Sequence, residues 1–172
     1  MVAVIVLSIV SAGCGGKDFN EEKAKNIVEG QPMRLEGEQA SLSPAQVDCG
    51  VRSELWEAPV ETSPGHSSAH LTQQARDLKF SDDVLTDPSF KRSYVQLKGD
   101  FALQVLSIVG IKSAPDDMKI GEFTVGAKID HACFSNPLPL MGVKKGVFKE
   151  DEPVRFRYRF TDAGWAMDQL LH

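Results

Sequence analysis

Residues 154–160 are Val-Arg-Phe-Arg-Tyr-Arg-Phe, an unbroken alternation of apolar and basic side chains. Successive side chains of a β-strand point to opposite faces of its sheet, so a period of two residues is typical of a strand. The stretch therefore predicts a strand with an apolar face against the core and a second face that carries Arg155, Arg157 and Arg159.

Other segments also have the composition and spacing of strands. Residues 101–111 alternate at first and then become almost continuously apolar, which predicts a central strand covered on both faces. Residues 123–134 alternate as well, residues 143–148 predict a short strand around Gly146, and the pattern of residues 47–56 also favours a strand.

Helices are expected to be few and short. Residues 18–29 favour one, with Asp18 or Asn20 as its N-terminal cap and Gly30 at its end. Thr72 is placed to cap a second short helix.

The chain is expected to end in a third helix over residues 163–171, capped by Thr161. Trp165 and its apolar neighbours are too apolar for a free tail. We therefore expect Trp165 to pack into the core.

The remaining segments indicate loops. Residues 31–43 have no firm period, residues 59–68 are typical of an exposed loop, and residues 81–89 are acidic and rich in turn formers. Together these patterns predict a single α+β domain over residues 18–172, with a mostly antiparallel sheet and a few short helices.

Two segments of the chain resemble each other. Residues 71–78 and 160–167 each contain a threonine, a small residue three positions later and an apolar residue six positions later. An apolar–Asp step lies upstream of each, close to Cys49 and to Cys133. The match predicts an internal duplication, which would make the fold pseudo-symmetric and place the two cysteines on equivalent strands. The alternative is a chance match, because threonine caps are common.

The start of the chain has its own pattern. Residues 1–10 are apolar apart from one serine, too short for a membrane-spanning helix of about 20 residues, and the triplet Ala-Gly-Cys ends at Cys14. This resembles the lipobox of a bacterial lipoprotein signal peptide. The resemblance implies that residues 1–13 are a signal peptide, that Cys14 carries lipid such as palmitate, and that residues 14–17 are a short tether. The alternative is a buried strand or helix, which the glycines around Cys14 disfavour.

The same resemblance implies a place in the bacterial cell envelope. Gly15, and not Asp, follows Cys14. By similarity to the sorting of Gram-negative lipoproteins, this residue favours transport across the periplasm to the outer membrane. The chain is similar to small envelope lipoproteins of unknown function, which implies a membrane-anchored, non-enzymatic binding or accessory role. The expected partners are the membrane, through the lipid, and another envelope protein or an anionic glycan. No cofactor is expected.

Other functions have weaker support. The net charge of -5 argues against nucleic acid as a partner, because phosphate binding needs a basic footprint. Residues 158–164 nevertheless resemble the Tyr-x-Leu-Thr-x-x-Gly turn of winged-helix regulators, which implies DNA binding as an alternative function. His66 and His70 have the spacing of metal ligands on a helix, but the neighbouring Pro, Gly and Ser residues favour a loop, so no metal site is expected.

The cysteines allow two further interpretations. If Cys14 carries lipid, Cys49 and Cys133 are an even pair that would form a disulfide in an oxidising compartment, or else two separate buried thiols. Alternatively, His131 could activate Cys133 as the thiolate nucleophile of an envelope enzyme.

Arg155, Arg157 and Arg159 are the candidate binding residues. On one face of a strand their side chains would lie about 7 Å apart, a spacing that suits an array of phosphates or carboxylates. The alternative is a solvated face whose arginines pair with the acidic residues 150–152.

Overall fold

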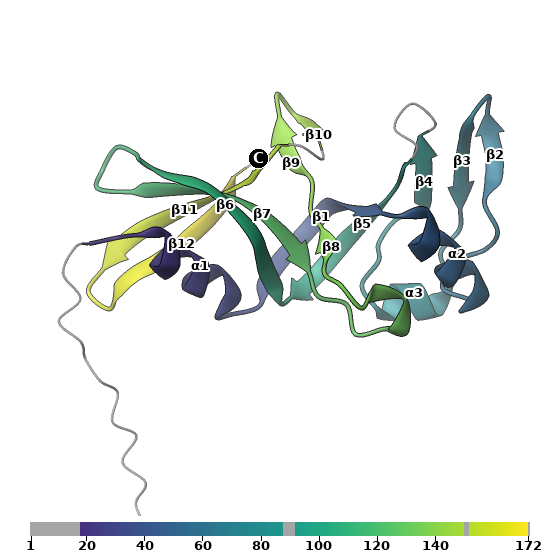
Figure 1. Ribbon diagram of the computed structural model, residues 1–172, viewed down its shortest axis with the longest axis horizontal. Coiled ribbons are helices and arrows are strands. Elements are labelled where there is room, and N and C mark those ends of the chain that lie inside the picture. Colours follow the sequence, from purple (N-terminus) through teal and green to yellow (C-terminus); the bar gives the residue numbers. More distant parts are fainter. Residues whose placement is uncertain (1–17, 88–91, 150–151, 172) are drawn as a thin grey trace, which may run out of the picture.

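The structure, a computed structural model, describes residues 18–87, 92–149 and 152–171. Two antiparallel sheets lie one after the other along the long axis of the molecule, with β1 and β5 in the middle (Figure 1). Residues 1–17, which include the expected signal peptide and Cys14, lie outside the described residues.

The first sheet has five strands in the order β1-β5-β4-β3-β2, each antiparallel to its neighbours. Trp56 and Phe80 pack edge to face in the core, and Phe134 contacts both rings. The elements are β1 (Met33–Leu42), α2 (Pro44–Arg52), β2 (Val60–Ser63), β3 (His66–Ala69), α3 (Gln73–Asp77), β4 (Val84–Asp87) and β5 (Arg92–Phe101).

The second sheet has the strand order β12-β11-β7-β6, and the short strand β8 pairs with β7. A two-stranded hairpin, β9–β10, rises from one side of this sheet (Figure 1). The elements are β6 (Leu103–Ser113), β7 (Lys119–Ala127), the 3-10 helix η1 (Ala132–Phe134), β8 (Leu138–Pro139), β9 (Gly142–Lys144), β10 (Val147–Lys149), β11 (Val154–Thr161) and β12 (Gly164–Leu171).

The two sheets are joined by a direct chain connection and by a backbone hydrogen bond. Phe101 ends β5 and Leu103 begins β6, so one nearly continuous run passes from the first sheet to the second. Further along, the Met141 amide donates to the Gln39 carbonyl of β1 at 2.8 Å. One cluster of buried apolar side chains extends through both sheets.

Helix α1 (Glu21–Glu29) packs against the second sheet and agrees with the expected helix. Asn20 is its cap, and its side chain accepts a hydrogen bond from the Lys23 amide at 2.9 Å. At the other end, the Glu29 carboxylate accepts from the Val105 amide of β6 at 2.8 Å. The helix thus satisfies one of the backbone donors on an edge strand.

The expected α+β class, with mostly antiparallel sheet and few short helices, is confirmed. Strand β11 also has the expected two faces, because Val154, Phe156 and Tyr158 are buried while the arginines between them are not.

The prediction of a strand over residues 47–56 is wrong, because α2 occupies most of this segment. Ser43 and Gln46 form a capping box, in which each side chain bonds the backbone of the other, and Pro44 stands in the first turn. Val47 and Gly50 are then buried on the same side of the helix. Local capping outweighs the strand-like composition here.

The prediction of a helix over residues 163–171 is also wrong, because this segment forms β12. The Thr161 hydroxyl does not cap a helix. It donates to the Gly164 carbonyl at 2.8 Å and closes a turn, in which Gly164 has a φ of 104° that suits glycine. Trp165 still contacts the core as expected, with its ring 4.5 Å from that of Phe19.

Segments without a clear period also contain strands. Within residues 31–43, β1 has a bulge between Glu36 and Glu38 that interrupts the alternation. The buried Glu38 carboxylate accepts from the amides of Glu36 and Gly37, which stabilises the bulge. The expected loops likewise contain β2, β3 and, in their described part, β4.

The strand expected at residues 101–111 exists as β6, but it is an edge strand and not a central one. Two bulges shift its register against β7, and Leu106 and Val109, which lie at these bulges, are exposed. Of the other two expected strands, β7 starts earlier than residue 123 and ends at Ala127, and residues 143–148 form most of the β9–β10 hairpin.

The duplication is not confirmed. Residues 71–78 contain the short helix α3, whereas residues 160–167 turn from β11 into β12. Cys49 lies in α2 and Cys133 in η1, so the expectation that both lie on equivalent strands is wrong.

Candidate functional site

The basic face of β11 extends across the second sheet. In the antiparallel register Arg155 pairs with Glu122 of β7, and Arg157 with Ile120. Lys112 of β6 lies opposite the same Ile120. Since paired residues share a face of the sheet, these side chains all project from the face opposite to the buried row of β11.

Asp168 lies between two of the arginines. A bulge in β12 falls opposite Arg157 and Tyr158 and leaves Asp168 as the extra residue. Its Oδ2 accepts from both Nε and Nη2 of Arg157 at 2.7 Å and lies 3.6 Å from Nη2 of Arg159. One carboxylate therefore serves two guanidinium groups.

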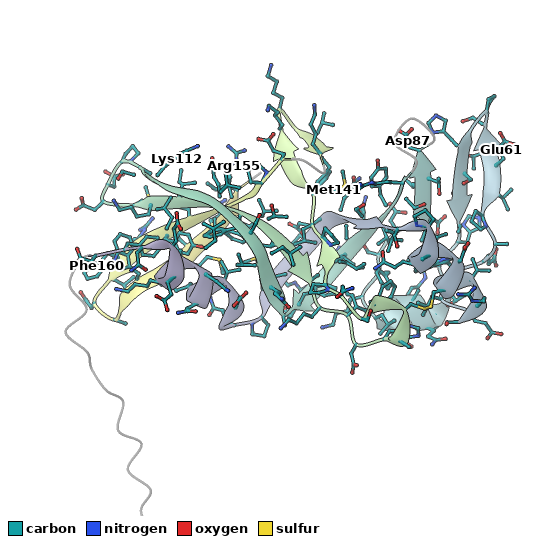
Figure 2. The ribbon with its side chains drawn as sticks, in the orientation of Figure 1. Glu61, Asp87, Lys112, Met141, Arg155 and Phe160 are labelled. Carbon is teal, nitrogen blue, oxygen red and sulfur yellow. A yellow bond between two sulfur atoms is a disulfide. The ribbon has the colours of Figure 1, made fainter. Side chains whose placement is uncertain are left out.

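Arg155 is held differently. Its Nη2 donates to the Val143 carbonyl of β9 at 3.3 Å, which connects the sheet to the β9–β10 hairpin. Its Nε is buried and has no acceptor among the described residues. Figure 2 shows Arg155 and Lys112 on the side of the sheet from which this hairpin rises.

We call this region the basic surface: the outer face of the second sheet together with the β9–β10 hairpin. It carries seven basic side chains and three acidic ones among the described residues, which gives +4 in a chain whose net charge is -5. They are Lys112, Lys144, Lys145, Lys149, Arg155, Arg157 and Arg159 with Glu122, Glu152 and Asp168.

Two acids of the basic surface, Glu122 and Glu152, lie deeper than the lysines that they pair with. Lys112 has 67% of its side chain exposed and its partner Glu122 only 16%. Lys144 and Glu152 show the same contrast, with 57% against 22%. These two lysines therefore lie outside their carboxylates and present positive charge to solvent even though they are paired. Arg157 and Asp168 are exposed to a similar extent, at 31% and 29%.

The expected pairing of the arginines with residues 150–152 is not seen in the described part of that segment. Glu152 pairs with Lys144, and residues 150 and 151 lie outside the described residues. The arginine partner Asp168 was missed because its segment had the composition of a helix. The strand register, and not the local sequence, places Asp168 and Glu122 beside the arginines.

Cys49 and Cys133 form a disulfide, with their Cα atoms 5.6 Å apart. The Nδ1 atom of His131 accepts from the Cys133 amide at 3.2 Å and so caps η1. The hypothesis of a Cys133 thiolate activated by His131 is therefore wrong for this form of the protein, since the sulfur is bonded and the imidazole faces the backbone.

The two histidines with metal-like spacing do not form a site. His66 begins β3, whereas the His70 ring bonds the Asp83 carboxylate. Among the described residues, no three His, Cys, Asp or Glu side chains are arranged to hold a metal ion.

The winged-helix resemblance of residues 158–164 does not extend to the structure. In that family the strand leads into a helix, whereas here it turns back as the β11–β12 hairpin.

A pocket that sequence reasoning missed lies at the free end of the second sheet. It has a volume of about 470 Å³ and lies between the turn that joins β6 to β7 and the end of β11. It is lined by Asp116, Asp117, Met118, Lys119, Arg159, Phe160 and Trp165.

Comparison of the chain with protein-family models, with curated proteins and with solved structures found no match. Within the part of the chain that the structure describes, no helix has the length and apolar character needed to cross a membrane.

Proposed function

We propose that this protein is a lipid-anchored component of the bacterial envelope, held by lipid on Cys14 in the outer membrane. The observation that carries the proposal is the use of the three cysteines. Cys49 and Cys133 bond each other, and the third is Cys14 of the lipobox-like triplet. Disulfides persist in oxidising compartments such as the periplasm, and lipoproteins pass through that compartment.

The proposed role is non-enzymatic binding of an anionic envelope component, either an anionic glycan or an acidic protein. The basic surface supports this role because it carries an excess of positive charge and because Lys112 and Lys144 are more exposed than their acidic partners. Guanidinium groups are well suited to carboxylate and phosphate arrays, since each offers several donors in one plane.

The anchor is tested by labelling bacteria that express the full chain with an alkyne-tagged fatty acid. The wild type is expected to be labelled and to sediment with outer membranes, and Cys14→Ser to be unlabelled. The matched control is Cys49→Ser with Cys133→Ser, which removes the disulfide and must keep the label. Equal labelling of wild type and Cys14→Ser contradicts the proposal.

The binding role is tested with a variant of three exposed lysines on the basic surface: Lys112→Gln, Lys145→Gln and Lys149→Gln. Retention on an immobilised anionic polysaccharide is expected to require less salt for elution, because each lost cation removes attraction and counterion release. The control changes three exposed cations elsewhere: Arg52→Gln, Lys98→Gln and Lys128→Gln. If both variants elute at the same salt concentration, net charge alone explains the retention and the basic surface is not the site.

A further inference from the structure

The described chain begins at the free end of the second sheet. Phe19 packs on Trp165 with ring centroids 4.5 Å apart and on Tyr158 at 4.8 Å. Trp165 in turn contacts Phe160 at 5.4 Å. These aromatic contacts fix the start of the fold beside the turns at this end, as Figure 1 shows for the chain and Figure 2 for Phe160.

This end must lie close to any membrane that holds lipid on Cys14. Three residues separate Cys14 from Asp18, and the four residue-to-residue steps between them span at most about 14 Å when fully extended. The pocket of about 470 Å³ is at the same end, because Trp165 and Phe160 line it. Under the proposed function, the pocket therefore lies within reach of phospholipid headgroups.

The walls of the pocket combine both charges with apolar surface. Lys119 and Arg159 contribute two cations, and Asp116 and Asp117 two carboxylates. Met118, Phe160 and Trp165 line it as well. The Nε1 donor of Trp165 is buried and finds no acceptor among the described residues. A donor left without a partner is costly to bury, which marks this wall of the pocket as one whose polar groups are incompletely satisfied.

We propose that this pocket binds the headgroup of a phospholipid that carries both a phosphate and a primary ammonium group, taken from the membrane that anchors Cys14. The inference rests on the proposed function. The phosphate accepts from Arg159 and Lys119, and the ammonium donates to Asp116 and Asp117. Phe160 and Trp165 lie against the glycerol and the first methylene groups of the lipid. This placement agrees with the enrichment of tryptophan at membrane interfaces.

The balance of charges sets the expected selectivity. Two cations and two carboxylates disfavour a purely anionic headgroup, because the acids would repel it. A trimethylated ammonium group has no N–H to donate, so phosphatidylcholine is expected to bind more weakly than phosphatidylethanolamine.

The test uses the two tryptophans of the full-length, lipidated protein in vesicles that contain spin-labelled lipid as a fluorescence quencher. Trp56→Phe leaves Trp165 as the probe at the pocket, and Trp165→Phe leaves Trp56, whose ring is buried and whose Nε1 donates to the Val47 carbonyl. In phosphatidylethanolamine vesicles, quenching of Trp165 is expected to exceed that of Trp56 several-fold. Equal quenching of the two overturns the inference.

The headgroup is tested by replacing phosphatidylethanolamine with phosphatidylcholine. Trp165 quenching is expected to fall several-fold in the Trp56→Phe protein, and Asp116→Asn with Asp117→Asn is expected to abolish the difference between the lipids. The control Asp48→Asn with Glu57→Gln, two exposed acids of the other half, must keep it. A wild-type pocket that does not distinguish the lipids overturns the inference.

Failure of the anchor is recognised separately. If the protein carries no lipid by fatty-acid labelling and does not float with vesicles, the proposed function has failed. If it is labelled and floats but Trp165 is not quenched more than Trp56, only the pocket assignment has failed.

Discussion

Tyr158 is a fully buried ionisable side chain of β11. Its ring is fully buried below α1, and its hydroxyl donates to the Ala24 carbonyl at 3.4 Å. Burial raises the pKa of the Tyr158 phenol well above its ordinary value near 10, because a phenolate cannot be solvated there. The folded state therefore keeps this proton at a pH where the unfolded chain has lost it.

The first prediction concerns alkaline pH. With a raised folded-state pKa, the contribution of Tyr158 to stability is fully present below about pH 10 and is lost as the pH rises beyond it. Melting temperatures measured from about pH 9 to about pH 11 should fall more steeply for the wild type than for Tyr158→Phe. Parallel curves for the two proteins would show that this phenol does not contribute to the alkaline loss.

The second prediction concerns Gly50. A glycine inside a helix normally costs about 1 kcal/mol relative to alanine, so Gly→Ala usually stabilises. Here a Cβ at Gly50 would overlap ring atoms Cζ2 and Cε2 of Trp56. We expect Gly50→Ala to lower the free energy of unfolding by about 1 to 3 kcal/mol, measured by urea denaturation. Asp48→Ala, an exposed position on the same helix, should change it by less than about 0.5 kcal/mol. A stabilised Gly50→Ala would contradict the packing of α2.

The β11–β12 hairpin contains an ion-paired cluster that affects both the stability of the fold and the charge of the basic surface. Asp168 holds Arg157 and Arg159 together from a bulge in β12. The side chains of Asp168 and Arg157 are about 30% exposed, at 29% and 31%. Solvent screening therefore keeps the energy of this pair small.

The third prediction is that Asp168→Asn lowers the stability of the protein and strengthens its binding to an anionic polysaccharide. The free energy of unfolding should fall by less than about 1 kcal/mol, because the pair is partly solvated. Retention on an anionic polysaccharide should increase, because the arginine row loses its counter-charge. Asp162→Asn in the adjacent turn makes the same change of net charge at a residue that pairs with no arginine among the described residues, and it should increase retention less. A variant Asp168→Asn that binds no better than Asp162→Asn would contradict the assignment of the arginine row as the site.

The elements also show what the sequence can and cannot predict. β11 was predictable because one face is buried and the other solvated along nearly its whole length, which imposes a clean period of two. α1 was predictable from its own cap and first turn. β12 was not, because Trp165, Met167, Leu170 and Leu171 recur at helical spacing while the bulge at Asp168 breaks the strand period.

Of the candidate site, only the three arginines of β11 were predictable from the sequence. The alternation of β11 identified Arg155, Arg157 and Arg159, since neighbours on one strand are fixed by sequence. Glu122 and Asp168 reach the site from neighbouring strands, and the pocket forms where the β6–β7 turn meets the end of β11. Contacts of this kind depend on sheet register, which a single sequence does not determine.

At the scale of the whole molecule, the disulfide ties the two halves together. Cys49 follows the first strand of the first sheet, and Cys133 lies between β7 and β8 of the second, 84 residues later. The Sγ atom of Cys133 also lies 3.4 Å from the Ser53 hydroxyl at the end of α2. The bond thus restrains a long segment of the unfolded chain.

The fourth prediction is the stability that this bond confers. For a closed loop of this length, the chain-entropy estimate is about 4 to 5 kcal/mol. The double variant Cys49→Ser, Cys133→Ser should lose stability of that order in urea denaturation, and a reducing agent should destabilise the wild type but not the variant. If the reducing agent leaves the wild type unchanged, the two cysteines are not bonded in solution.

The proposed function depends on lipidation of Cys14 in a disulfide-bonded envelope protein. Intact mass measurement of the protein extracted from bacterial outer membranes, alkylated without reduction, tests it most directly. The expected mass is that of a chain that begins at Cys14 and carries the lipid groups of a lipoprotein, with no alkyl group added to Cys49 or Cys133. A chain that retains Met1, or one that starts at Cys14 and takes up an alkyl group there, would contradict it.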